Sequence, residues 1–467
     1  MALEGKGSAV RTRIRTGVAL ATLGLGLALS IGASVPSATS SPVPDDSAVE
    51  NLTPLKDTLP FPVGAAIDPR ETSGDASALL LRHFNQFTPE NDMKPEAWYD
   101  ADHQFSPSPR IATLMDFARD NRMRVYGHVL VWHSQIPSWF FFRDDGITQL
   151  TDTPADQEIL KARLRDHIFA VAKYLSDGWG EFGAGNPIVA FDVVNEVISD
   201  GAVGTDGLRR SLWYQILGPQ YIDLAFQWAD EAFNHEYAAP GTDRPVALFI
   251  NDYNTERPDK RARYLALIDR LLADGVPIDG IGHQFHVYLP VPVESLADAL
   301  DDCSGRGLVQ AVTEMDVPTG RPEQRHFVEQ GHYYQDAFRV FREHADEMFS
   351  VTVWGLYDMR SWRHVQGGPL IFDDDLQAKP AYYGIVEGYA DEKPLSAFRE
   401  SRSWTYVYIG LAVAAIAAYV LGMRWWRRRR LTEWKRRRER SPATTSTSEG
   451  AVDALSRPLP QKRRRRS

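Results

Sequence analysis

The stretch FDVVNEVISD at residues 191–200 predicts a buried strand that ends in a carboxylate. Phe191 and the two valines after Asp192 are apolar and β-forming, which is typical of a strand covered on both faces. Asn195 and Glu196 follow directly. An ionised carboxylate resists burial unless it is paired or hydrogen-bonded, so Glu196 needs a partner or a chemical task. A glutamate in a solvated loop at the strand end is the simpler alternative.

Short apolar runs of this kind recur along the middle of the chain and alternate with segments of helical spacing. The expected strands are residues 61–67, 84–88, 124–129, 188–194, 246–250, 278–284, 308–313 and 349–354. Helical spacing appears at residues 114–121, 157–175, 222–233, 260–274 and 324–341. The alternation predicts the α/β class, as a (β/α)8 TIM barrel, although a doubly wound open sheet shows the same order. No glycine-rich phosphate loop stands out, which disfavours nucleotide binding.

A barrel places its chemistry at the C-terminal ends of its strands, and those ends are polar here. They read TPENDMK (88–94), GHVLVWHSQIPSWF (127–140), NE (195–196), NDYN (251–254), GIGHQFHVYLP (280–290), TEMDV (313–317) and VWGLYDMRSWR (353–363). One such residue at one strand end is more often packing than catalysis. Amide, imidazole, carboxylate and indole groups at seven ends indicate a site.

These groups suit a carbohydrate, because indole faces stack on sugar rings while amides, imidazoles and carboxylates bond hydroxyls. Cutting a glycosidic bond also needs two carboxyl groups, one to protonate the leaving oxygen and one to attack or to activate water. Glu196 and Glu314 close the fourth and seventh expected strands. In a closed barrel those ends can face each other across the axis.

The strand-end stretches resemble, in order, the signatures of glycoside hydrolase family 10, the retaining endo-β-1,4-xylanases. The resemblance covers residues 61–385 and includes the closing PLIFDDDLQAKPAYYGI. It implies the barrel fold and a groove that binds xylan from within the chain. By the same resemblance, Glu196 corresponds to the general acid/base and Glu314 to the nucleophile.

The family pattern also implies a set of substrate-binding residues. They are Glu90, Asn91, Lys94, His128, Trp132, Gln135, Asn195, Gln284, His286, Trp354 and Trp362. Three positions depart from the pattern: Phe191 stands where Trp is usual, Pro95 follows Lys94, and Phe285 replaces a small polar residue. These changes lie beside the site and put rate and substrate preference in question rather than the chemistry.

No metal and no cofactor is expected. Cys303 is the single cysteine, and no Cys/His zinc pattern is present. The net charge is −10, although residues 424–467 carry 16 Lys and Arg against 4 Asp and Glu. The remaining body is therefore strongly acidic and would repel a nucleic-acid backbone. The sequence leaves the oligomeric state open, and a monomer is expected.

Both ends of the chain carry membrane signals. Basic residues precede an apolar stretch at residues 17–34, so residues 1–41 are expected to be a signal peptide or an uncleaved anchor. Residues 404–423 hold no charge and, as a helix, would span about 30 Å, the thickness of a bilayer core.

The expected organisation follows from these signals. A linker occupies residues 42–58, the catalytic domain 59–392, a juxtamembrane linker 393–403, a transmembrane helix 404–423, and a largely disordered basic tail 424–467. Because basic residues favour the cytoplasmic side, the tail is expected inside the cell and the catalytic domain outside.

Three other functions stay open at this point. A β-1,4-glucanase or mixed-linkage enzyme could use the same scaffold, because preference depends on room beside the central sugar. A surface glycan-binding protein with an inactive site is disfavoured by the presence of both acids. An adhesion or signalling receptor is the third, although no folded module is visible in the basic tail.

Overall fold

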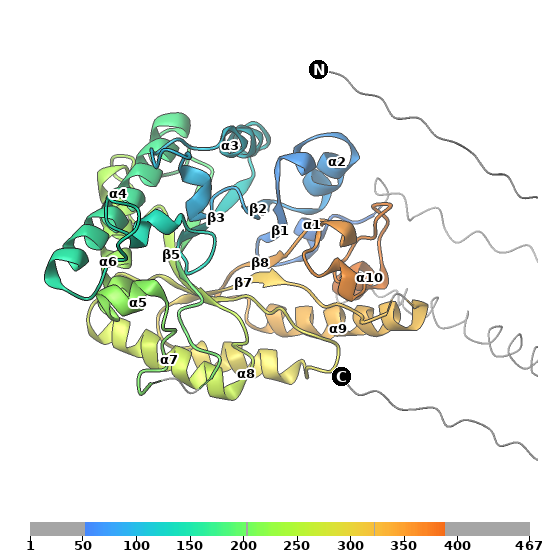
Figure 1. The fold of residues 1–467 in the computed structure, drawn as a ribbon. Helices are drawn as coiled ribbons and strands as arrows, with labels where there is room; N and C mark the ends of the chain where they lie inside the picture. The colour runs from blue at the N-terminus through green and yellow to red at the C-terminus, as the bar shows by residue number, and fades with distance from the viewer. Residues whose placement is uncertain (1–51, 202–203, 322, 388–467) are drawn as a thin grey trace, which may run out of the picture. The chain divides into compact units, whose positions relative to one another are not determined.

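The computed structural model describes residues 52–201, 204–321 and 323–387, and these residues contain a closed barrel of eight parallel strands (Figure 1). The strands follow one another in chain order, and β8 closes the barrel by pairing with β1. Closure confirms the barrel and rules out the doubly wound sheet. The strands are β1 (Val63–Ile67), β2 (Gln86–Pro89), β3 (Arg124–Val131), β4 (Ile188–Asn195), β5 (Ala247–Asp252), β6 (Gly280–His283), β7 (Val309–Met315) and β8 (Met348–Val353).

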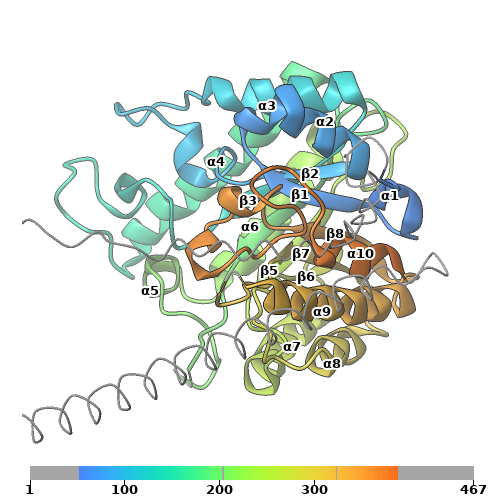
Figure 2. The same cartoon turned by 90° about the vertical axis from the view of Figure 1, so that its right-hand side faces the viewer.

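Helices connect the strands and lie outside them; in Figure 2, α7, α8 and α9 run side by side on one side of the barrel. The α-helices are α1 (Leu55–Thr58), α2 (Gly74–His83), α3 (Pro109–Asn121), α4 (Pro154–Trp179), α5 (Leu212–Leu217), α6 (Gln220–Ala229), α7 (Pro258–Ala273), α8 (Glu294–Cys303), α9 (Gln324–Glu343) and α10 (Pro380–Glu387). All five predicted helical segments are confirmed. The segment 222–233 runs through α6 into a π-helical turn at Asp230–Glu236.

Five strands continue one or two residues beyond their predicted C-terminal ends: β2, β3, β4, β5 and β7. The prediction stopped where polar residues begin, but the parallel pairing continues through them. Asn195 pairs with Asn251, and Met315 pairs with Val353. As a result, Asn195, Asn251 and Glu314 belong to paired strands, whose hydrogen bonds fix their backbones.

Side chains fill the barrel toward the N-terminal ends of its strands. The rings of Phe249, Tyr126 and Phe349 pack against one another; the centroid of Phe249 is 5.3 Å from that of Tyr126 and 5.2 Å from that of Phe349. Gly280 makes room for this ring, because a Cβ atom at that position would come within 2.2 Å of it. The interior is therefore a packed core at one end and a polar cavity at the other.

Residues 55–58 were predicted to lie in a linker, but they form α1. Leu55 is fully buried, and the hydroxyl of Tyr382 donates to the carbonyl of Thr53 at 2.6 Å. The folded unit therefore begins earlier than residue 59, because an apolar side chain in this short segment packs against the barrel.

The predicted leader, juxtamembrane linker, transmembrane helix and basic tail lie outside the described residues. Among the described residues, no helix combines the length and the apolar character that crossing a membrane requires.

The Gly280 contact yields a stability prediction. Gly280→Ala should lower the midpoint of thermal unfolding, because the added Cβ atom would meet the ring of Phe249, which is already packed against Tyr126 and Phe349. We expect a loss of about 1–3 kcal/mol in the free energy of unfolding, the usual cost of overpacking. Gly178→Ala is the control, since Gly178 is in α4 and a Cβ atom there meets nothing within 4 Å. Equal unfolding midpoints for the two variants would contradict this packing.

Candidate active site

A cavity of about 580 Å³ opens at the C-terminal ends of the strands. All 13 residues predicted for the site line it, from the ends of six strands and the loops that follow them. They are Glu90, Asn91, Lys94, His128, Trp132, Gln135, Asn195, Glu196, Gln284, His286, Glu314, Trp354 and Trp362.

Glu314 lies deep in this cavity, and its side chain is only 6% exposed. Nδ2 of Asn251 donates to its Oε1 at 2.9 Å, and Nε2 of His286 lies 3.1 Å from its Oε2. Burial raises the pKa of Glu314, but the hydrogen bond with His286 and the positive charges of His128, His286 and Lys94 outweigh it, so the pKa is lowered. The carboxyl group of Glu314 is therefore ionised near neutral pH.

His286 holds its proton because it lies between two carboxylates. Its Nδ1 is 2.9 Å from Oδ2 of Asp316, opposite the contact with Glu314. Burial lowers its pKa, but the charges and hydrogen bonds of Asp316 and Glu314 raise the pKa to about 10. Asp316 is in turn bonded by Nη1 of Arg363 at 2.5 Å and Nε1 of Trp362 at 3.1 Å.

Glu196 is more accessible than Glu314, with 16% of its side chain exposed. It directly follows β4 in a left-handed backbone conformation, with φ of 58°, which is unusual for a residue other than glycine. Nε2 of Gln284 donates to its Oε1 at 3.3 Å, and Nε2 of His133 lies 3.8 Å from its Oε2. Burial, with the nearby charges of Arg209 and Lys260, lowers the pKa of His133 to about 4, so this imidazole is neutral.

Three amide side chains connect the two carboxyl groups. Oδ1 of Asn195 accepts hydrogen bonds from Gln284 and from Asn251, each at 3.1 Å. Gln284 also donates to Glu196, and Asn251 also donates to Glu314. Since both donors use the oxygen of Asn195, its Nδ2 group is available to a ligand in the cavity.

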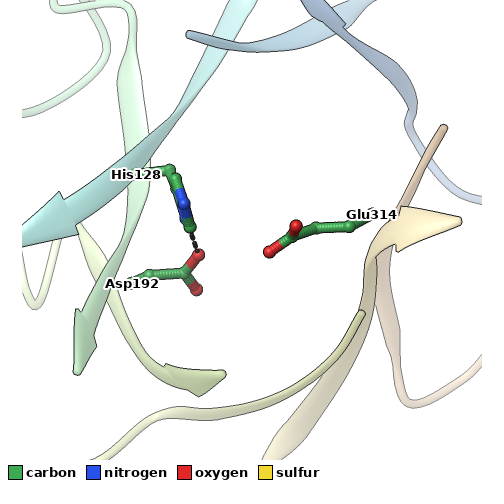
Figure 3. Close-up of side chains that lie close together, drawn as sticks. All are labelled: His128, Asp192 and Glu314. Atoms are coloured by element: carbon green, nitrogen blue, oxygen red, sulfur yellow. Dashed lines mark hydrogen bonds and ion pairs between the residues drawn. The ribbon is translucent and has the colours of Figure 1, made fainter. Parts of the chain in front are cut away.

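A buried group beside Glu314 was not predicted. Asp192 lies within β4 and is 1% exposed. Its carboxylate accepts from the hydroxyl of Tyr126 at 2.8 Å and lies 2.8 Å from Nδ1 of His128, as Figure 3 shows for the histidine. A charged residue inside an otherwise apolar strand was the available signal. Asp192 thereby fixes the ring of His128, which lines the cavity.

His128, Asp192 and Glu314 are close enough to hold a metal ion, with one ligand atom of each within 4.8 Å of the others. Each carboxylate, however, already has at least two polar side chains as partners. Asn251 donates to both, and each is also close to a histidine nitrogen. This arrangement fits a hydrogen-bonded network that positions His128 and Glu314.

Lys94 lines another side of the cavity. Its Nζ donates to Asn91 and to Gln135, each at 2.9 Å, and lies 5.0 Å from the ring centroid of Trp132. Two tryptophans form other parts of the wall: Trp354 is buried, whereas Trp362 is 58% exposed. The cavity therefore presents flat apolar faces beside fixed hydrogen-bonding groups.

Six cavity residues were not among the predicted site residues: His133, Arg209, Tyr253, Asn254, Tyr288 and Arg363. Five of them stand in the strand-end stretches quoted above, so the signal was present. Arg209 stands in none of them. It comes from the loop after β4, which carried no recognisable pattern.

Comparisons with known proteins identify the family. The family model for glycosyl hydrolase family 10 matches residues 55–388. The chain is 35% identical to the exoglucanase XynX of Acetivibrio thermocellus, over 70% of this chain and 28% of that protein. It is 34% identical to endo-1,4-beta-xylanase A of Halalkalibacterium halodurans, over 70% of this chain and 84% of that protein.

A solved structure is similar as well. A mutant of the intracellular xylanase TsXylA of Thermoanaerobacterium saccharolyticum, in complex with xylotriose, superposes with a TM-score of 0.63 and 34% identity, over 71% of this chain and 96% of that one. The chain spans little more than a quarter of XynX and nearly all of TsXylA. Fold, cavity and these matches agree: the chain belongs to glycosyl hydrolase family 10.

Proposed function

We propose that this chain hydrolyses internal β-1,4-xylosidic bonds of xylan with retention of configuration. The observation that carries the proposal is the pair Glu196 and Glu314, which line one cavity and are connected through Asn195. The names of the xylanase relatives support xylan as the substrate. No cofactor or metal takes part in the proposed reaction.

In the proposed mechanism, ionised Glu314 attacks the anomeric carbon while Glu196 protonates the departing oxygen. The glycosyl ester is then hydrolysed by water, from which Glu196 takes a proton. The two environments suit these roles: Glu314 is buried among donors that keep it ionised, and Glu196 is more exposed, so that it can exchange protons.

The other cavity residues bind the sugars in this proposal. Asn195 donates from Nδ2 to the 2-hydroxyl of the sugar at the cleavage point, a contact that strengthens in the transition state. Trp354 and Trp362 stack on sugar rings. Hydroxyls are bonded by Glu90, Asn91, Lys94, His128, Gln135, Gln284 and His286, and Trp132 completes the wall.

A β-1,4-glucanase is the second candidate, because the relative XynX is named an exoglucanase. Glucose carries a hydroxymethyl group that xylose lacks, so it needs more room beside the central sugar. Comparing the hydrolysis of xylan with that of carboxymethylcellulose by the full chain separates the two. A higher kcat/KM on the cellulose derivative would assign the glucanase.

We also propose that residues 404–423 anchor the chain in the cell membrane, with the barrel outside and the basic tail in the cytoplasm. The support is the uncharged stretch of 20 residues followed at once by arginines. Such an anchor would hold the enzyme near the cell that takes up its products.

The central test removes the nucleophile. The full chain should release oligosaccharides from xylan, and proton NMR should show the β-anomer as the first product. Glu314→Ala should lower kcat by roughly three orders of magnitude or more, because the covalent step is lost. Glu158→Ala, at an exposed glutamate on α4, should leave kcat unchanged. A first product in the α-configuration, or near-normal activity of Glu314→Ala, would refute the mechanism.

The charge of His286 yields a pH prediction. Activity requires ionised Glu314, and protonated His286 lowers the pKa of that carboxyl group. His286→Gln keeps a donor but removes the charge, so the pKa of Glu314 rises. The acidic limb of the pH profile of kcat/KM should then move to higher pH. His235→Gln, at an exposed histidine on the outer surface, is the control; an unmoved acidic limb in His286→Gln would argue against the assignment.

The anchor yields a fractionation prediction. After expression in bacterial cells, the full chain should sediment with membranes and resist extraction with alkaline carbonate. A variant that ends at residue 403 should appear in the supernatant instead when residues 1–41 are cleaved off. Terminal sequencing of the membrane form would show whether residues 1–41 are removed. Release of the full chain by carbonate would contradict the anchor.

A further inference from the structure

Arg209 is brought to the site by a loop that folds back on itself. The segment after β4 leaves the barrel at Glu196 and returns through a bridge between Ile198 and Leu208. The backbone N–H of Arg209 then donates to the carbonyl of Val197 at 2.8 Å. A residue 13 positions along the chain therefore lies beside Glu196.

The guanidinium of Arg209 contacts the backbone of Glu196 rather than its carboxyl group. Nε donates to the carbonyl oxygen of Glu196 at 2.6 Å, and Nη2 donates to the hydroxyl of Tyr253 at 2.9 Å. On the other side, the N–H of Glu196 donates to the carbonyl of Asn251 at 2.9 Å. The backbone N–H and the backbone carbonyl of Glu196 therefore each have a hydrogen-bond partner.

The backbone of Glu196 needs these hydrogen bonds. Glu196 has a φ of 58°, a conformation that a side chain disfavours, so the surroundings must impose it. Changing that φ would swing the side chain away from Gln284 and out of line with a leaving oxygen. Proton transfer depends strongly on such alignment.

Charged residues beneath the loop hold the same segment at two further points. Oδ2 of Asp252 accepts from the N–H of Ile198 at 2.9 Å. Nζ of Lys260, which is fully buried, lies 2.7 Å from Asp252 and 3.0 Å from Asp200. The hydroxyl of Tyr253, which receives the Arg209 bond, donates in turn to Asp200.

We propose that Arg209 is a positioning residue that fixes the backbone of Glu196, so that its carboxyl group is aimed at the leaving oxygen. This inference rests on the proposed function, in which Glu196 is the general acid. Arg209 itself transfers no proton. Its guanidinium joins the backbone of Glu196 to Tyr253, and through Tyr253 to Asp200 and the buried Lys260.

Leaving groups of different acidity test the inference. Acid assistance matters for a poor leaving group, such as phenol, and little for 2,4-dinitrophenol, which departs without a proton. For the full chain, Arg209→Met should lower kcat/KM on phenyl β-xylobioside by roughly tenfold to a hundredfold, part of the usual effect of general acid catalysis. On 2,4-dinitrophenyl β-xylobioside it should change less than about twofold, since no proton is needed.

Arg210→Met is the matched control. Arg210 is the neighbouring arginine in the chain, but it is paired with Asp206 at 2.7 Å, and both side chains of that pair are about equally exposed. It should leave both values of kcat/KM unchanged. Arg209→Lys keeps the charge but loses the two-pronged donor, so it should show the same selective loss to a smaller extent. This variant also carries the test if Arg209→Met does not fold.

Glu196→Ala separates the two levels of the proposal. It should show a steep selective loss on the phenyl substrate; equal losses on both substrates would overturn the role of Glu196 and the inference with it. If Glu196→Ala behaves as expected while the Arg209 variants lose equally on both substrates, or lose nothing, the positioning role alone is overturned.

Discussion

An ionised carboxylate at the bottom of a protein cavity is the condition on which this site depends. Removing the side chain of Glu314 from water opposes its ionisation, and that cost must be offset by donors and positive charges close by. Asn251 and His286 supply the donors, and the charges of His286, His128 and Lys94 act from several sides. Much of the polar network around the cavity can be understood as serving this one group.

The barrel explains how so many partners reach one carboxylate. Neighbouring parallel strands end at the same edge, so Asn195 on β4 pairs in register with Asn251 on β5. A further bridge joins His286 to Asp316, which places the imidazole between Asp316 and Glu314. Each donor thus belongs to a rigid element, and the network needs little side-chain ordering when a substrate binds.

The two acids differ because their backbones differ. Glu314 belongs to β7, and its side chain lines the cavity. Glu196 stands one residue beyond β4, where the chain turns with a positive φ, and this turn leaves its side chain more exposed. Any residue can adopt the extended backbone of a strand, as Glu314 does. The positive φ of Glu196 requires additional contacts, and the loop that carries Arg209 provides them.

The sequence by itself determined the alternation of strands and helices, and it determined which residue types stand at the strand ends. Both are local properties: apolar runs and helical spacing appear within a few residues, and all 13 predicted site residues come from such stretches. Only the tertiary structure decided that the sheet closes, because closure depends on pairing between β1 and β8, almost 300 residues apart. It alone revealed Asp192 and Arg209 beside the site. Their partners are Tyr126 and His128 for the first and Tyr253 for the second, and contacts between such distant segments arise only when folding brings them together.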